Sequence, residues 1–356
     1  MLPTSDHPVF KYVNLVRQAQ ATRDAQVLND VTRMYARSYS KLKADIDAML
    51  KVIKETGANK DEMLRLSVTR NLLEGVKSEM NDFANLLGDK IESTIAREIA
   101  EANISSLGMV QMMLPGISAR LAGTWAKIAP DQVYTMYGFL SPNGALYSRL
   151  KANFGTALAD RLKDSLMDGF VTGMNPRAIA RMISNSLGTG LNWAMTTTRT
   201  ANLWAYRTAS HLNYQRNSDV VKGWTWFAQL DDRCCMSCVA MHGTQHRLDE
   251  ILDDHHAGRC TALPTTASYA ELGFPGMSDI DMSVTTGKDW FNSLSESRQR
   301  SMMGPGVYNS WKNNMFEFDK LSRVYNDPVY GIMRGESSLK ALLGDKAKLF
   351  YGHEGD

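Results

Sequence analysis

Apolar residues recur every three to four positions along two stretches of the first hundred residues, which places them on one face of an α-helix. Residues 57–59 interrupt the pattern, and Asn59 is a suitable N-cap for a second helix. We therefore predict an antiparallel hairpin of two long helices. The first stripe is Leu28, Val31, Tyr35, Leu42, Ile46, Met49 and Ile53, and the second is Leu73, Val76, Met80, Phe83, Leu87, Ile91 and Ile95.

Helical spacing continues in the middle of the chain. Asn175 followed by Pro176 is a typical helix start, and Gly188 and Gly190 predict that this helix ends near them. Residues 191–217 have the character of a further helix. Before this region, another stripe predicts a helix that carries Leu146, Leu150, Phe154, Leu158, Leu162, Leu166 and Phe170.

The pattern changes at residues 220–230, which are rich in β-branched and aromatic residues with partial alternation. This composition is typical of a β-strand. Trp224 and Trp226 are expected on one face and Thr225 and Phe227 on the other, because side chains alternate along a strand. We expect the aromatic rings to pack in a core. The fold class predicted from these patterns is mainly α, with a small α+β part towards the C-terminus.

All four cysteines fall within 27 residues, at Cys234, Cys235, Cys238 and Cys260. Such clustering excludes a disulfide-stapled secreted fold, in which bridges connect distant segments. The first ten residues have neither the basic nor the apolar part of a secretory leader, and the longest apolar stretch, near residues 107–114, is too short for a membrane span. We expect a soluble protein, made in a reducing compartment, with a local thiol site.

The formal net charge of +2 hides a gradient along the chain. Residues 104–230 hold 12 Lys and Arg against 5 Asp and Glu, and no Glu occurs between Glu101 and Glu250. A basic segment favours a polyanion or an acidic protein as partner, or it is simply the solvated face of helices. No zinc-finger spacing, aromatic RNA-binding motif or long basic run accompanies it.

Cys235 and Cys238 form a CxxC motif, which lets two thiolates from one tight turn bind one tetrahedral metal ion. The preferred prediction is a structural zinc site of Cys235, Cys238, Cys260 and either His255 or His256, leaving Cys234 spare. His242 and His246 also follow the CxxC closely and are alternative ligands. A redox CxxC pair, or free thiols in ordinary loops, are the other interpretations.

No signature of a hydrolase or nucleotide-binding enzyme occurs in the sequence. We therefore predict a protein that is not an enzyme, with no catalytic residues. Two alternative functions are considered: a nucleic-acid-binding module with a zinc knuckle, and a metal-dependent hydrolase built on Asp254, His255 and His256.

The region from Thr198 to Pro264 resembles the Mu F-like minor head protein family, also called the phage head morphogenesis family, of tailed bacteriophages. The resemblance covers about a fifth of the chain. This sequence departs from the family pattern at Ala201, Cys234 and His256, and Gly258 stands where some members of the family have Cys. The matching positions are Arg199, Thr200, Trp224, Trp226, Asp231, Arg233, Cys235, Cys238, His242, Gly243, His255, Gly258, Arg259 and Cys260.

This resemblance implies a phage minor head (minor capsid) protein with a structural and assembly role in head morphogenesis, and with a role in DNA packaging or ejection as an extension of it. The implied location is the virion, in the head interior or at the portal vertex, after synthesis in the host cytoplasm. The implied partners are the portal protein and the major capsid or scaffolding protein, with packaged DNA as a further candidate and several copies per virion. By alignment, His255 is the favoured fourth ligand.

Together these observations divide the chain into four expected segments. Residues 1–103 form the helical hairpin, and residues 104–218 form a basic helical region. Residues 219–284 hold the Mu F-like strand and the Cys/His knot, and residues 285–356 form a C-terminal helical extension.

Overall fold

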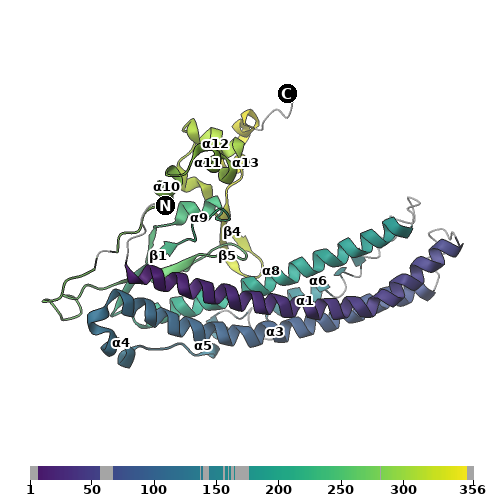
Figure 1. The fold of residues 1–356 in the computed structure, drawn as a ribbon, viewed down its shortest axis with the longest axis horizontal. Helices are drawn as coiled ribbons and strands as arrows, with labels where there is room; N and C mark the ends of the chain where they lie inside the picture. Colours follow the sequence, from purple (N-terminus) through teal and green to yellow (C-terminus); the bar gives the residue numbers. More distant parts are fainter. Residues whose placement is uncertain are drawn as a thin grey trace. The chain divides into compact units, whose positions relative to one another are not determined.

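A computed structural model gives the fold as mainly helical, with long N-terminal helices and a small β region towards the C-terminus (Figure 1). This agrees with the predicted fold class. The predicted turn at residues 57–59, the cap at Asn175 and much of the helix expected after Phe154 lie outside the described residues. The structure describes residues 7–56, 67–136, 138, 144–154, 157–158, 160–161, 164, 176–280 and 282–350.

The elements follow the chain in an order that places the long helices before the strands. The helices are α1 (Pro8–Thr56), α3 (Ser67–Met113), η1 (Pro115–Ile117), α4 (Ser118–Thr124), α5 (Pro130–Met136), α6 (Ala145–Phe154), α8 (Pro176–Arg216), α9 (Met236–Met241), α10 (Gly287–Asn292), α11 (Glu296–Met303), α12 (Pro305–Lys312), η3 (Phe318–Leu321), α13 (Leu339–Leu343) and η4 (Gly344–Leu349). The strands are β1 (Val221–Phe227), β2 (Gln245–His246), β3 (Thr261–Thr266), β4 (Ser322–Asp327) and β5 (Gly331–Glu336).

Contacts divide the chain into two compact units, and α1, α3 and α8 contribute residues to both. The first unit comprises Met1–Ala19, Glu98–Val133 and Leu203–Asp356. The second comprises Gln20–Arg97 and Tyr134–Asn202. The four segments expected from the sequence stay a prediction.

In the second unit, the α1 and α3 segments pack antiparallel. Lys90 pairs with Asp30, whereas Lys41 pairs with Glu79, so positions on the two helices run in opposite directions. Most of the predicted stripe positions form the interior, whereas Leu28 and Leu73 are half-buried. The buried positions are Val31, Tyr35, Leu42, Ile46, Met49, Val76, Met80, Phe83, Leu87, Ile91 and Ile95. Tyr35 and Phe154 each lie against Phe83, with ring centroids 5.0 and 4.9 Å away.

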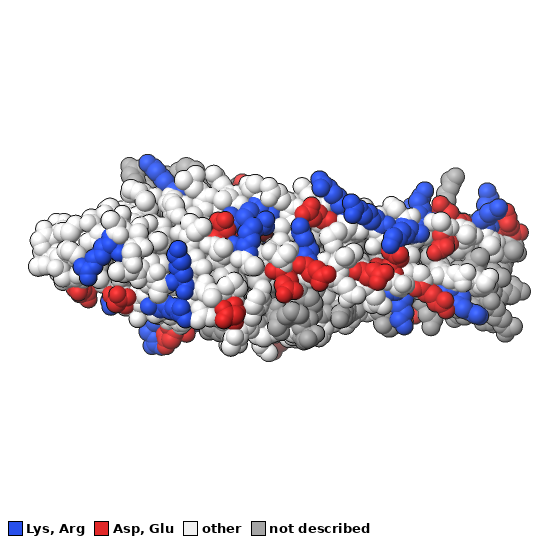
Figure 2. All heavy atoms as spheres, turned by 90° about the horizontal axis from the view of Figure 1, so that it is seen from below, with Lys and Arg blue, Asp and Glu red and all other residues white. Residues whose placement is uncertain are grey.

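Charged side chains on these helices mix both signs. Lys43 lies near Asp47 and Lys51 near Glu55, one helical turn apart. Figure 2 shows that Lys and Arg are interspersed with Asp and Glu over the face drawn there. Among the described residues, no helix is both long and apolar enough to span a membrane.

The predicted end of a helix at Gly188 and Gly190 is wrong, because α8 runs without interruption from Pro176 to Arg216. A Cβ at Gly190 would lie 2.7 Å from the Tyr35 hydroxyl oxygen, whereas one at Gly188 would meet no described residue beyond its own helical turn within 4 Å. Gly190 is therefore a close-packing position rather than a helix terminator. The general helix-ending tendency of glycine is overridden here by tertiary packing.

In the first unit, β1 is the central strand of a three-stranded antiparallel sheet of order β2–β1–β3. Trp224 and Trp226 are fully buried in one cluster, and Phe227 packs on Phe10 in another, so the predicted alternation is confirmed. The Trp224 indole N–H donates to the carbonyls of Arg247 and Glu250. The sheet thereby holds the residues on both sides of the cysteine motif.

A second sheet, the antiparallel hairpin β4–β5, lies in the C-terminal segment that the sequence led us to expect as helical. Its strands alternate only weakly between buried and exposed residues. The local hydrophobic pattern therefore does not predict the strand pairing, in which Ser322 is opposite Glu336 and Asp327 is opposite Gly331.

Candidate metal centre

Two loops of the first unit carry the cysteines and histidines. We call residues 231–238 the cysteine loop and residues 253–260 the histidine loop. Cys235 is the N-cap of α9, and its sulfur accepts a hydrogen bond from the Cys238 backbone N–H at 3.3 Å. The first turn of α9 therefore brings the two CxxC thiols together.

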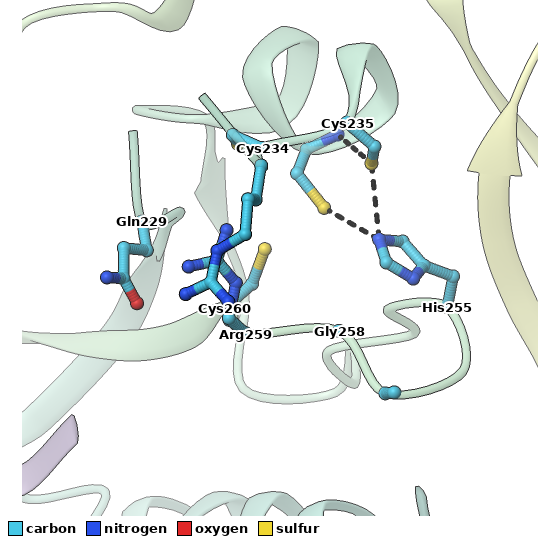
Figure 3. Close-up of a pocket in the computed structure, with 10 residues that line it drawn as sticks. Gln229, Cys234, Cys235, His255, Gly258, Arg259 and Cys260 are labelled. Carbon is cyan, nitrogen blue, oxygen red and sulfur yellow. Dashed lines mark hydrogen bonds between the residues drawn. The ribbon is translucent and has the colours of Figure 1, made fainter. Parts of the chain in front are cut away.

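His255 completes a three-residue group with these thiols. Its Nε2 lies 3.2 Å from the Cys235 sulfur and 3.3 Å from the Cys238 sulfur. The three donor atoms lie within 4.8 Å of one another, and Figure 3 shows the His255 imidazole facing the Cys235 sulfur. We call Cys235, Cys238 and His255 the ligand group.

The other ring nitrogen of His255 sets the orientation of the imidazole. Nδ1 lies 2.9 Å from the His256 carbonyl oxygen, to which it donates its proton. Nε2 is then the nitrogen that offers a lone pair to a metal. A backbone carbonyl on the far nitrogen is a recurring second-shell feature of metal-binding histidines.

A second group overlaps the first at Cys238. The Cys238 sulfur, the Cys260 sulfur and a carboxylate oxygen of Asp254 also lie within 4.8 Å of one another. Cys235, Cys238, His255 and Cys260 all line one cavity of about 90 Å³ (Figure 3). Cys234 lines the cavity as well but belongs to neither group found among the described residues.

Asp254 is held by Arg207, which projects from α8. The Arg207 guanidinium donates to the Asp254 carboxylate at 2.7 Å and to the carbonyls of Gly258 at 2.8 Å and Cys260 at 3.1 Å. Both side chains of the ion pair are buried, with 7% and 1% exposed. Arg207 therefore fixes the course of the histidine loop from inside.

A second ion pair joins the two loops directly. Asp231 of the cysteine loop accepts two hydrogen bonds of 2.6 Å from the Arg259 guanidinium, a bidentate arrangement with defined geometry. A Cβ at Gly258 would lie 2.1 Å from the Asp254 carboxylate, so a residue without a side chain is needed there. These contacts give Asp231, Gly258 and Arg259 of the sequence motif a structural role.

The ionisation of the ligand group follows from these contacts. The hydrogen bond with Cys238 lowers the pKa of Cys235 to about 6, against the effect of burial, and His255 adds to the lowering. Burial acts to lower the pKa of His255, but the hydrogen bond with Cys235 and the charge of Asp254 outweigh it and raise that pKa to about 10. Without metal, these shifts favour a thiolate at Cys235 and an imidazolium at His255. Metal binding must displace the His255 proton.

The other three histidines considered as ligands have different partners. His256 Nε2 lies 3.0 Å from Asp327, and His242 Nδ1 accepts from the Ala228 backbone N–H at 3.0 Å. His246 stacks on Trp224 with ring centroids 4.2 Å apart. Within the described part of the chain, neither ligating group includes any of them.

The donor set suits a soft or borderline metal ion. Two sulfur atoms and an imidazole nitrogen are the donors that structural zinc sites use, and the residues are half-buried or buried. The residues present therefore fit a zinc ion, with Cys235, Cys238 and His255 as the residues that can hold it.

The sequence patterns did not identify Arg207 as part of this site. It lies within a helical segment about 50 residues before the histidine loop that it contacts. The structure buries residues 200–211 without a break, Arg207 included, but nothing in the sequence marks Arg207 as a buried residue. A buried arginine requires an acceptor, but nothing in the sequence says which carboxylate supplies it.

Comparison with known families finds one match to this region. The family model described as Phage Mu protein F like protein matches residues 160–267, which include both loops. This confirms the resemblance seen in the sequence. The comparisons with curated proteins and with solved structures found no significant match.

The family match covers less than half of the chain and relates residues 160–267 to a class of phage proteins. Phage Mu protein F like proteins are structural proteins of phage heads, so the match implies a phage head morphogenesis protein. The matched segment contains all of α8, the three-stranded sheet and the ligand group.

Proposed function

We propose that this protein is a minor head protein of a tailed bacteriophage and acts in head assembly at the portal and the capsid interior. Its role is structural rather than enzymatic. The observation that carries the proposal is the family match over the two loops, where Asp231, Cys235, Cys238, His255 and Arg259 occur in the expected order.

The proposed partners are the portal protein and the major capsid or scaffolding protein, with several copies of the chain in each virion. The family match supports capsid-related partners. Long antiparallel helices such as α1 and α3 present extended faces, which suit contact with other subunits.

The test is mass spectrometry of purified heads together with co-purification of tagged portal protein. We expect the chain in both the particle and the portal complex. Its absence from both would contradict the proposal, and its presence in heads alone would remove the portal as partner.

Contact with packaged DNA is a further part of this proposal, supported by the excess of basic residues over residues 104–230. Binding of this kind weakens steeply as salt rises, because cationic side chains release counterions from the phosphates. Fluorescence anisotropy with duplex DNA in low and high salt tests it. No binding at low salt would remove DNA from the list of partners.

We also propose that the Mu F-like region is held together by one structural zinc ion on Cys235, Cys238, His255 and Cys260. The first three form the ligand group, and Cys260 is the remaining thiol that touches Cys238 in the overlapping group. Asp254 is the alternative fourth donor, but its Oδ2 already accepts a hydrogen bond from the Arg207 guanidinium. A bound ion would tie both loops to α9.

Elemental analysis of the purified chain tests the zinc site. We expect about one zinc per chain, and we expect Cys235→Ser to lose it. Cys234→Ser is the matched control and should keep it, because Cys234 lies in neither ligating group. No zinc in protein prepared without chelators would contradict the proposal.

A further inference from the structure

The hairpin β4–β5 begins more than 50 residues after the family match ends, yet it contacts both ligand loops. All of these residues belong to the first unit. The hairpin therefore contacts the two loops of the ligand group through residues that lie outside the matched segment.

Towards the histidine loop, the hairpin makes two polar contacts. Asp327, at the end of β4, lies 3.0 Å from His256 Nε2. Arg334, on β5, donates to the Asp253 carboxylate at 3.0 Å. His256 is also the residue whose carbonyl accepts the Nδ1 proton of His255. Asp327 thus fixes the residue that orients the histidine ligand.

Towards the cysteine loop, the hairpin contacts the first turn of α9. The Glu336 carboxylate accepts a hydrogen bond of 2.6 Å from the Met236 backbone N–H, next in the chain to Cys235. The hydroxyls of Ser322 and Ser237 lie 2.8 Å apart. Because the early N–H groups of a helix have no partner within it, a carboxylate there stabilises both the helix start and its orientation.

Asp327 is itself held in place. Its Oδ1 accepts from the backbone N–H groups of Val329 and Tyr330 at 2.8 and 3.0 Å, which leaves Oδ2 for His256. The Tyr330 ring adds edge contacts with His256 and packs near Trp204 of α8. The hairpin turn is thus a rigid support for the histidine loop.

We propose that β4–β5 is a clamp on the metal site, with Asp327 and Glu336 as positioning residues for His255 and Cys235. This inference rests on the proposed zinc site. The coupling is reciprocal: a hairpin that favours the ligand geometry raises metal affinity, and bound metal stabilises the hairpin by the same free energy.

Competition for zinc between the protein and a chromophoric chelator tests whether the hairpin raises zinc affinity. We expect Asp327→Asn and Glu336→Gln each to weaken zinc binding about ten-fold, the usual size for loss of an outer-shell partner. Asn at 327 keeps an oxygen for the two turn N–H groups, so this variant retains the hairpin turn. Asp319→Asn is the matched control, since Asp319 is an exposed acid that pairs only with its neighbour Lys320 among the contacts described.

The visible absorption of the cobalt-substituted chain separates positioning from simple stability. A changed ligand geometry shifts the cobalt bands of Asp327→Asn, whereas a merely destabilised fold leaves the spectrum of the loaded protein unchanged. We expect a shift for Asp327→Asn and none for Asp319→Asn.

Hydrogen exchange on the unmodified chain tests whether bound zinc stabilises the hairpin, and this measurement needs no variant. Adding zinc to the stripped protein should slow exchange of amides in residues 322–336. Equal exchange with and without zinc, or variants that bind zinc as tightly as the unmodified chain, would overturn the clamp while leaving the zinc site intact. If the unmodified chain binds no zinc, the zinc proposal itself fails, and the clamp with it.

Discussion

Arg207 holds the histidine loop from α8, since it donates to a carboxylate and two carbonyls of that loop. Burying two opposite charges gives little net stability when both are present. Removing one of them is costly, because the other charge is left buried without a partner. Substitution of Arg207 is therefore expected to lower the free energy of unfolding more than substitution in a surface ion pair.

We predict that Arg207→Met lowers the free energy of unfolding by about 3–5 kcal/mol, because it leaves the Asp254 carboxylate buried and uncompensated. Urea denaturation followed by circular dichroism measures this. Adding Asp254→Asn should recover part of the loss by removing the unpaired charge.

The control for this prediction is Arg247→Met. Arg247 and Asp249 also form an ion pair, but with 79% and 65% of their side chains exposed. The expected loss is below about 1 kcal/mol, as for other surface pairs. Equal losses for Arg207→Met and Arg247→Met would contradict the structural role assigned to Arg207.

His242 is a second residue with a measurable effect, in this case on how stability depends on pH. Burial lowers the pKa of His242 to about 4, and the charge of Arg17 adds to the lowering. The folded protein thus favours the neutral ring, so its contribution to stability is present above the ordinary pKa of 6.5. That contribution is lost as pH falls from about 6.5 towards 4.

We predict that His242→Gln flattens this pH dependence. Glutamine retains an acceptor for the Ala228 N–H but does not titrate over this range. The unmodified chain should lose up to about 3 kcal/mol more than the variant between pH 7 and pH 4. Unfolding in urea at several pH values measures the difference, and parallel curves for the two proteins would count against the prediction.

At the scale of elements, α8 shows how packing overrides local tendency. Two glycines within three residues would end many helices, yet α8 continues through them. Gly190 is buried against Tyr35, whereas a Cβ at Gly188 would meet no atom of another element within 4 Å among the residues that the structure describes. The two glycines therefore differ in the space around them: Gly190 has a close neighbour and Gly188 does not.

We predict opposite effects for alanine at these positions. Gly188→Ala should stabilise the protein by roughly 0.5–1 kcal/mol, because alanine loses less backbone entropy in a helix. Gly190→Ala should destabilise it by about 1–3 kcal/mol, because the new methyl group displaces Tyr35. Thermal unfolding measures both, and stabilisation by both substitutions would show that Gly190 is not a packing position.

At the scale of the whole molecule, the proposed zinc ion would connect the two loops, α9 and the sheet into one folding unit. A ligand that binds only the folded chain stabilises it in proportion to the logarithm of its concentration. Sites of this kind are seldom formed in the unfolded chain, so metal affinity and folding are linked.

We predict that zinc at 100 times its dissociation constant raises the free energy of unfolding by about 2.7 kcal/mol. Differential scanning calorimetry with and without a chelator measures the shift in the transition midpoint. Cys235→Ser should abolish the response to zinc, and Cys234→Ser should retain it. A zinc response that survives Cys235→Ser would remove Cys235 from the site.

The sequence alone determined the features that depend on neighbours along the chain. The stripes on α1 and α3 and the alternation of Trp224 and Phe227 on β1 follow from helical and strand periodicity. The CxxC geometry is also local, since one helical turn separates the thiols. The family resemblance used the same local string of residues.

Only the tertiary structure decided which distant residues meet. It brought His255 to the two thiols and directed His256 to Asp327, although the two histidines are adjacent in the chain. It also paired Arg207 with Asp254 across 47 positions. Such contacts depend on how α8, the loops and β4–β5 pack together, and periodicity within one element carries no information about its partners in another.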